Sequence, residues 1–171
     1  WHYVRGLAWA ATHQTKQAEQ ELAKLRNVLK QLSKNDRVIS MNSASSILRI
    51  ASEVLAGEIA AAKNQFDQAI LHLDKAVRLD DALLYTEPPE FHFPPRLALG
   101  AILLKAGRAN EAETVYWEDL KRIRNNGWAL FGLMQALTAQ NKTERAAIVK
   151  ERFEQTWQRA DRELKASRFG L

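Results

Sequence analysis

The chain has 171 residues with a formal net charge of +5, and 46% of its residues are hydrophobic while 26% are charged, as in ordinary soluble globular proteins. It contains no cysteine, which excludes disulfide bonds and thiolate metal sites. No apolar run approaches the roughly 20 residues that a membrane-spanning helix needs, so we expect a soluble protein of the cytoplasm or the periplasm.

Helix-forming residues dominate the chain, and the few glycines and prolines stand where helices should stop. Apolar residues at three- and four-residue spacing predict eight helices. These helices cover residues 1–13, 15–32, 44–63, 66–79, 94–106, 109–123, 128–140 and 143–166. Residues 33–43 and 80–95 break the pattern and predict loops, the second of which holds all four prolines.

A two-helix unit recurs along the chain. A glycine is followed by an alanine twelve residues later, and a large side chain stands four residues beyond the alanine. This pattern occurs at Gly6, Ala18 and Leu22, at Gly57, Ala69 and Leu73, and at Gly100, Ala112 and Tyr116. Small residues let two helices cross closely while large ones fill the space between units, so the pattern predicts stacked helical hairpins. A fourth unit begins with Trp128-x2-Phe131-Gly132, but its alanine, Ala146, comes two residues late after Gly132 and leaves the register open.

These positions resemble the tetratricopeptide repeat (TPR) family, whose signature is W-x2-L-G-x2-Y followed by A-x3-F. The chain offers Arg96-x2-Leu99-Gly100-x2-Leu103 with Ala112-x3-Tyr116, and FDQAILHLDKAVRLDD is its most family-like stretch. The resemblance implies an all-α fold, a right-handed α-α superhelix of about four TPR-like hairpins with a long C-terminal capping helix. It also implies a single domain over residues 1–171, with repeats at about 1–33, 44–80, 94–124 and 127–166 and insert loops at 33–43 and 80–95.

A narrower resemblance concerns the segment from Tyr85 to Leu137. This segment is similar to the C-terminal part of bacterial TPR proteins of undefined role, which implies a bacterial origin and leaves export open. Because the chain starts at Trp1, without a methionine and in mid-pattern, we expect it to be a fragment of a longer protein.

No catalytic constellation is present in the sequence. The four histidines, His2, His13, His72 and His92, lack metal-ligand spacing, and there is no phosphate-binding glycine loop or GxSxG elbow. We therefore expect no enzyme, no metal and no cofactor. Basic residues mostly have acidic neighbours, so we expect no nucleic-acid partner, although a pI of about 9.6 and the cluster at residues 121–124 keep that function as the weakest alternative.

In TPR proteins the inner face of each first helix usually lines a groove that holds an extended peptide. The resemblance places that face at Tyr3, Leu7, Val54, Glu58, Ala61, Leu97, Ala101, Leu104, Lys105, Ala129, Leu133 and Ala136. These residues are largely apolar or small, and the lysine, asparagine and arginine set that grips a terminal carboxylate in chaperone-binding members is absent. We expect an apolar groove for a peptide or an amphipathic helix, unless missing N-terminal sequence fills it.

The loop YTEPPEFHFPP is a second candidate for partner binding. It places Tyr85, Glu87, Phe91 and His92 close to Arg96, and long aromatic loops are often functional. The alternative interpretation is a lid packed over the groove or the previous repeat.

Together these features predict a non-catalytic protein–protein interaction scaffold. Its partner is expected to be a protein or peptide, with no membrane insertion, and homo-oligomerisation is left open. The alternative is a docking or oligomerisation domain of a larger enzyme or sensor. A catalytic domain encoded upstream of Trp1 would decide in favour of this alternative.

Overall fold

The structure of the protein is a computed structural model that describes residues 1–32 and 41–168. Within these ranges the chain forms eight helices and no β-strand. The helices are α1 (His2–Ala11), α2 (Thr15–Gln31), α3 (Ala44–Ala62), α4 (Phe66–Asp81), α5 (Pro95–Lys105), α6 (Ala109–Arg122), α7 (Gly127–Ala139) and α8 (Thr143–Trp157). The predicted all-α class is therefore confirmed, and the helices lie close to the predicted positions except the last, which ends earlier than predicted. Part of the predicted loop at 33–43 lies outside the described residues.

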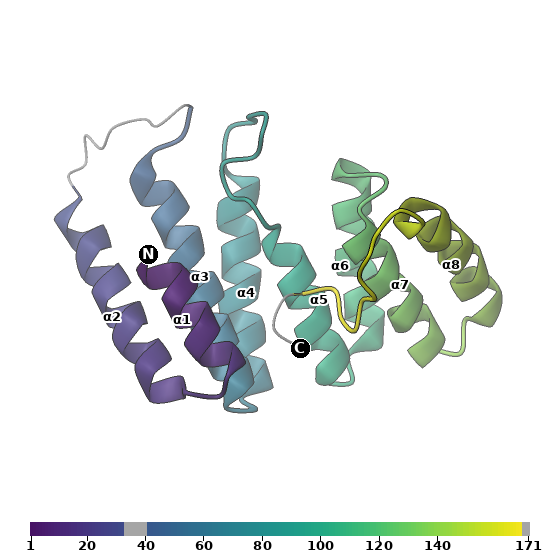
Figure 1. Cartoon of the computed structure of the whole chain (residues 1–171), viewed down its shortest axis with the longest axis horizontal. Coiled ribbons are helices and arrows are strands. Elements are labelled where there is room, and N and C mark those ends of the chain that lie inside the picture. Colours follow the sequence, from purple (N-terminus) through teal and green to yellow (C-terminus); the bar gives the residue numbers. More distant parts are fainter. Residues whose placement is uncertain (33–40, 169–171) are drawn as a thin grey trace. The chain divides into compact units, whose positions relative to one another are not determined.

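The chain divides into two compact units, one over Trp1–Pro95 and one from Arg96 onward. The first contains α1 to α4, coloured purple to blue-green in Figure 1, and the second contains α5 to α8, coloured teal to yellow. In each unit neighbouring helices pack on one another, among them α3 on α4 and α7 on α8.

The four helix pairs share the same connecting turn. One residue in each turn has a positive φ between 58° and 75°, a conformation that glycine, asparagine and histidine adopt more readily than other residues. Its backbone N–H closes the end of the first helix, as in Asn64 N to Ala61 O at 2.9 Å. The four turn residues are His13, Asn64, Gly107 and Asn141, each five residues before the repeat alanine.

This turn settles the register of the fourth hairpin. The repeat glycines precede the turn residue by seven positions in the first three hairpins, so the equivalent position before Asn141 is Met134. Ala146 then stands twelve residues after Met134, in the regular interval. Gly132, which the sequence pattern marks as the repeat glycine, serves a different purpose described below.

The core of the first unit is built around α3. Ten of its 19 residues are buried, and it packs on α1, α2 and α4. The glycines lie where large side chains cross: a Cβ at Gly57 would come within 2.7 Å of Leu73 Cγ, and one at Gly6 within 2.5 Å of Leu55 Cδ2. Leu55 and Leu73 are themselves fully buried, so close helix crossing explains the small residues here.

The first two hairpins each contain a contact between a carboxylate and an imidazole. The imidazole is on the first helix in one hairpin and on the second helix in the other. His2 lies four residues before Gly6 and contacts Glu21 of α2 at 2.6 Å. In the next hairpin the carboxylate, Glu53, lies four residues before the glycine and contacts His72 of α4 at 2.7 Å. The pair thus joins the two helices of each hairpin at the same repeat positions.

The Glu21 carboxylate should make stability depend on acid pH. The hydrogen bond with His2, helped by Lys24, lowers the pKa of Glu21 from 4.5 to about 2. An unfolded chain then binds more protons than the folded one between these values, so the stabilisation is complete above pH 4.5 and is lost as the pH falls toward 2. We expect Glu21→Gln to flatten this part of the stability curve, measured by urea unfolding at a series of pH values. Exposed Glu144→Gln is the control, and a Glu21→Gln variant with the wild-type slope would contradict the assignment.

The core of the second unit is built around Tyr116 of α6. Its ring is fully buried between two glycines, and a Cβ at Gly100 or Gly132 would come within 2.6 Å or 2.5 Å of Cε1. Gly132 is therefore small because it makes room for this ring from the preceding helix. The Tyr116 hydroxyl contacts Ser167 Oγ at 2.5 Å, and Ser167 donates to the Leu97 carbonyl oxygen at 3.0 Å.

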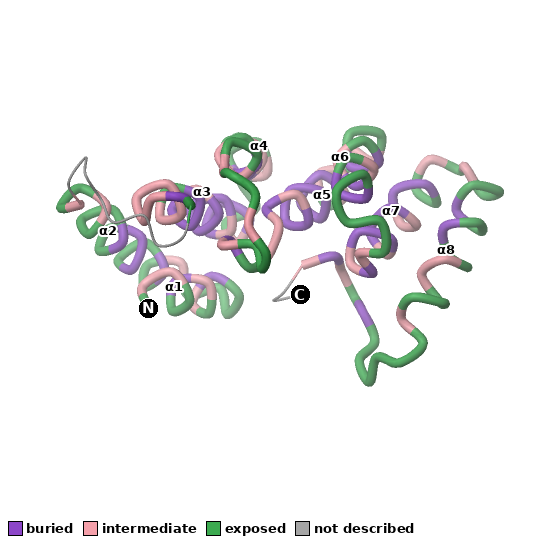
Figure 2. The backbone as a smooth tube through the Cα atoms, turned by 90° about the horizontal axis from the view of Figure 1, so that it is seen from above, coloured by how far each residue is buried: buried purple, intermediate pink, exposed green. Residues whose placement is uncertain are grey.

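The predicted capping helix is wrong beyond Trp157. α8 ends there, and residues 158–168, which we call the tail, turn back across the second unit. Figures 1 and 2 both show the tail running from the end of α8 past α7 toward α5. The physical reason is that Trp157 already packs against Gly127, the first residue of α7. A Cβ added to Gly127 would come within 2.5 Å of Trp157 Cε3. A longer helix would have no partner for its apolar stripe.

Candidate functional site

The predicted inner-face residues of the first unit lie on α1 and α3. Val54 is buried, whereas Tyr3, Leu7 and Glu58 are half-buried. The Tyr3 ring contacts Phe91 at a centroid distance of 5.9 Å, and burial raises the pKa of Tyr3 above its ordinary value. The face predicted to receive a partner is thus partly covered by the chain itself.

The cover is the loop between α4 and α5, and Asn42 anchors it. The Asn42 amide donates to the Leu84 carbonyl at 2.9 Å and to Glu90 Oε2 at 2.7 Å, and its oxygen accepts from the Leu84 N–H at 2.7 Å. Asn42 is buried, so the anchor is shielded from water and holds Phe91 against the first hairpin. This agrees with the interpretation of the loop as a lid.

The other predicted loop residues do not converge on one site. Tyr85 and Glu87 are exposed and hydrogen-bonded to each other, and this bond raises the pKa of Tyr85. His92 is exposed, and its ring lies edge-to-face with Tyr3 at a centroid distance of 6.3 Å. Arg96 belongs to the second unit, where its charge lies near Asp119. Burial raises the pKa of the Asp119 carboxyl, while the Asn126 hydrogen bond and Arg96 act in the opposite direction.

In the second unit the tail contacts one residue of the predicted inner face, Leu97. Leu97 is almost fully buried, Leu104 is half-buried and Lys105 is exposed. From the tail, Leu164 is 6% exposed and Ser167 only 1% exposed. Burial also lowers the pKa of the neighbouring Arg168 to about 10. The sequence left open whether missing N-terminal residues fill the groove; among the described residues, the segment beside Leu97 is the chain's own C-terminal tail.

The tail contact rests on a chain of two hydroxyl groups. Because Ser167 donates its proton to the Leu97 carbonyl, the Tyr116 hydroxyl must donate to Ser167 Oγ. All three groups are buried, where an unpaired polar atom costs about 1–3 kcal/mol. Ser167 thus provides a hydrogen-bond partner for both the Tyr116 hydroxyl and the Leu97 carbonyl on the α5–α7 face, by which we mean the surface around Leu97, Gly100 and Gly132.

Three comparisons bear on identity. No model of a known protein family, no curated protein and no solved structure matches the chain. No helix in the described ranges is long and apolar enough to cross a membrane. Nor do the described histidine and acidic side chains form a group of three that could hold a metal ion.

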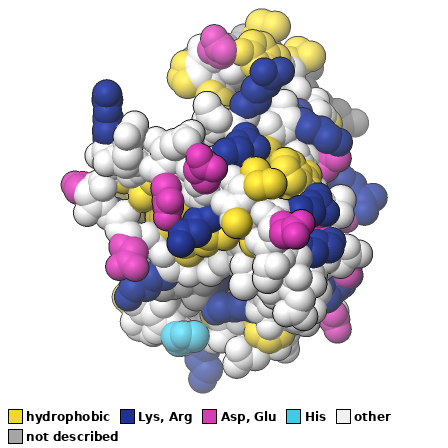
Figure 3. Space-filling view, turned by 90° about the vertical axis from the view of Figure 1, so that its right-hand side faces the viewer, with side chains coloured by type: hydrophobic (Ala, Val, Ile, Leu, Met, Phe, Trp, Pro, Cys, Tyr) yellow, Lys and Arg dark blue, Asp and Glu magenta, His cyan; other side chains and the backbone are white. Residues whose placement is uncertain are grey.

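The face seen in Figure 3 has no single patch of one charge. Its lysine and arginine side chains alternate with aspartate and glutamate around small apolar areas. Several basic residues of the described chain are paired, for example Lys142 with Glu113 at 2.6 Å. Burial opposes ionisation of Glu113, but the hydrogen bonds from Lys142 and Gln140 outweigh it and lower the pKa of this carboxyl. The candidate site is therefore best described by its packing and hydroxyl contacts.

Proposed function

We propose that the chain is a non-catalytic protein–protein interaction scaffold that binds a peptide or helix of a partner on the faces of its first helices. We also propose that its hairpins stack as TPR-like repeats in a right-handed superhelix. Two observations support the stacking: the four hairpins share one turn geometry, and second helices pack on the first helix of the next hairpin, α2 on α3 and α6 on α7.

The tail on the α5–α7 face is the observation that carries the proposal. This face already holds a non-helical segment through the Ser167 hydroxyl, and Leu164 of the same segment is buried. Burial of a leucine stabilises such contacts by about 1.5–3 kcal/mol, and each hydrogen bond adds about 1 kcal/mol. A partner segment with the same chemistry would make the same contacts, in competition with a tail that is held at high effective concentration by the chain.

The test uses a fluorescein-labelled peptide with the sequence of residues 158–168. In the full-length chain, Leu164→Asp with Ser167→Asp should release the tail and expose the face, because both changes bury charge against apolar groups. We expect saturable binding of the peptide to this variant and much weaker binding to the wild-type chain, measured by fluorescence anisotropy.

The matched control carries Gln158→Asp with Ala160→Asp, which changes the charge equally at exposed positions of the tail. It should behave as the wild-type chain does. A released variant that stays helical by circular dichroism yet does not bind the peptide would contradict the proposed function.

A further inference from the structure

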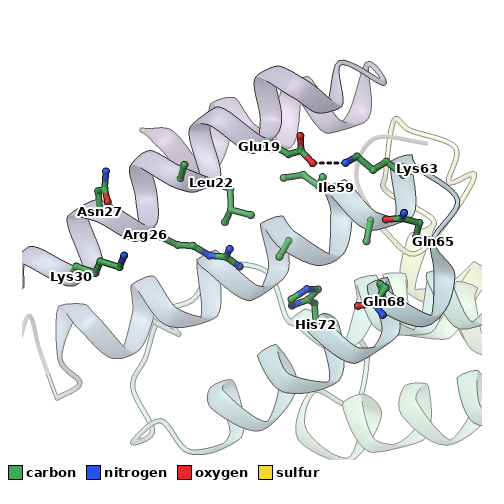
Figure 4. Close-up of a pocket in the computed structure, with 13 residues that line it drawn as sticks. Glu19, Leu22, Arg26, Asn27, Lys30, Ile59, Lys63, Gln65, Gln68 and His72 are labelled. Carbon is green, nitrogen blue, oxygen red and sulfur yellow. Dashed lines mark hydrogen bonds and ion pairs between the residues drawn. The ribbon is translucent and has the colours of Figure 1, made fainter.

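A groove lies between α2 and α4 with α3 as its floor, away from the faces considered so far. Its volume is about 490 Å³, and its apolar part consists of Leu22 and Ile59 together with the small residues Ala23, Ala56 and Ala60. Figure 4 shows α2 and α4 on either side of α3, with Leu22 and Ile59 between them. Small side chains on the floor let another chain approach the helix backbone closely.

Basic side chains line this groove in excess of acidic ones. Lys63 is paired with Glu19, the one carboxylate among its lining residues. Arg26 and Lys30 also line it, and neither has a carboxylate partner among the described residues. Arg26 instead donates to Ser52 Oγ of α3 at 3.3 Å, and Figure 4 shows it reaching from α2 toward α3.

The arrangement of Arg26 and Lys30 carries a cost. Residues four apart lie on one face of a helix, and like charges at that spacing destabilise it by a few tenths of a kcal/mol. A carboxylate placed over both side chains would remove this repulsion and form charge-assisted hydrogen bonds. At the other end, His72 contacts Glu53 at 2.7 Å, and Glu53 is also bound by Lys75, so that carboxylate is already paired.

The dimensions fit a protein segment. Along α2 the lining runs from Glu19 to Lys30, which at 1.5 Å per residue is about 17 Å. This length corresponds to about three helical turns or five extended residues. Because the groove is open along its length, it suits a peptide with an apolar side chain on the floor and acidic side chains at Arg26 and Lys30 better than an enclosed small molecule.

We propose that this groove, the α2–α4 groove, binds an acidic segment of a partner protein. The segment places an apolar side chain against Ala23, Ala56 and Ala60 and carboxylates against Arg26 and Lys30. This groove is separate from the α5–α7 face, so the proposal for the groove can be tested independently of the tail.

The experiment measures anisotropy of a fluorescein-labelled peptide made of Glu-Ala-Ala-Leu units, with a Lys-Ala-Ala-Leu peptide for comparison. We expect saturable binding of the acidic peptide, weakening as salt is added. Arg26→Glu with Lys30→Glu should reduce its affinity by roughly tenfold or more. Both residues are exposed, so the fold should persist, and unchanged thermal unfolding would verify it.

The matched control is Lys16→Glu with Arg49→Glu, two exposed basic residues outside the groove. It should leave the affinity nearly unchanged. Equal losses in the two variants, or equal binding of the lysine peptide, would overturn the proposal. Displacement of the acidic peptide by inorganic phosphate at constant ionic strength would also overturn it, because the groove would then hold a small anion.

Discussion

Replacing Gly132 by alanine should destabilise the second unit by about 2 kcal/mol or more. An added Cβ would come within 2.5 Å of Tyr116 Cε1 and Oη, and that ring is fully buried between Gly100 and Gly132. Alanine favours helix over glycine by roughly 1 kcal/mol, whereas overpacking at a fully buried ring costs about 3 kcal/mol, the upper end of the usual range for overpacked cores. The clash therefore outweighs the gain in helix propensity. Urea unfolding followed by circular dichroism measures the difference.

The chain provides a matched control for this substitution. Gly107 has a φ of 75° and no atom within 4 Å of its Cβ position, and asparagine stands at the equivalent turn positions Asn64 and Asn141. Gly107→Asn should therefore cost less than about 1 kcal/mol. Combining Gly132→Ala with Tyr116→Leu should recover part of the loss, and an additive double variant would contradict the proposed contact.

A chain that ends at Lys142 should aggregate, whereas one that ends at Gln158 should stay soluble and helical. The shorter chain lacks α8, whose Phe153 and Trp157 pack on Phe131 and Trp128 of α7 at centroid distances of 5.5 and 5.8 Å. With Val149, which is buried, this loss amounts to about 5 kcal/mol or more. Terminal repeats also need a polar outer face for solubility. Sedimentation velocity separates the two outcomes.

The chain that ends at Gln158 is the matched comparison because it keeps α8 and lacks only the tail. It should lose the Leu164 burial and the Ser167 hydrogen bonds, a smaller change of about 3 kcal/mol. Equal aggregation of the two truncated chains would show that the tail, and not α8, caps the unit.

Helix positions followed from the sequence because apolar spacing and turn residues agree along most of the chain. The register of the fourth hairpin did not follow, since Gly132 has the appearance of a repeat glycine although the Tyr116 ring is what requires it to be small. A better signal was present: a histidine, asparagine or glycine five residues before each repeat alanine, which the shared turn needs for its positive φ.

The tail and the α2–α4 groove could not be read from local sequence. Residues 158–168 have good helix propensity, yet α8 ends at Trp157, whose ring packs on Gly127 at the start of α7. Likewise, Arg26 and Lys30 have the appearance of an ordinary solvated helix face until α3 and α4 are placed beside them. Asn42 was missed for the same reason, because its partners Leu84 and Glu90 are more than forty residues away.

The most direct test of a segment-binding α5–α7 face is an NMR measurement on the full-length, isotope-labelled chain. We expect nuclear Overhauser effects between the Tyr116 ring and the Ser167 side chain in the wild-type chain. When the unlabelled peptide with the sequence of residues 158–168 is added to the Leu164→Asp, Ser167→Asp variant, contacts from the peptide serine to Tyr116 and Leu97 should appear in their place. Absence of the intrachain contacts, or peptide contacts confined to another part of the chain, would contradict the account.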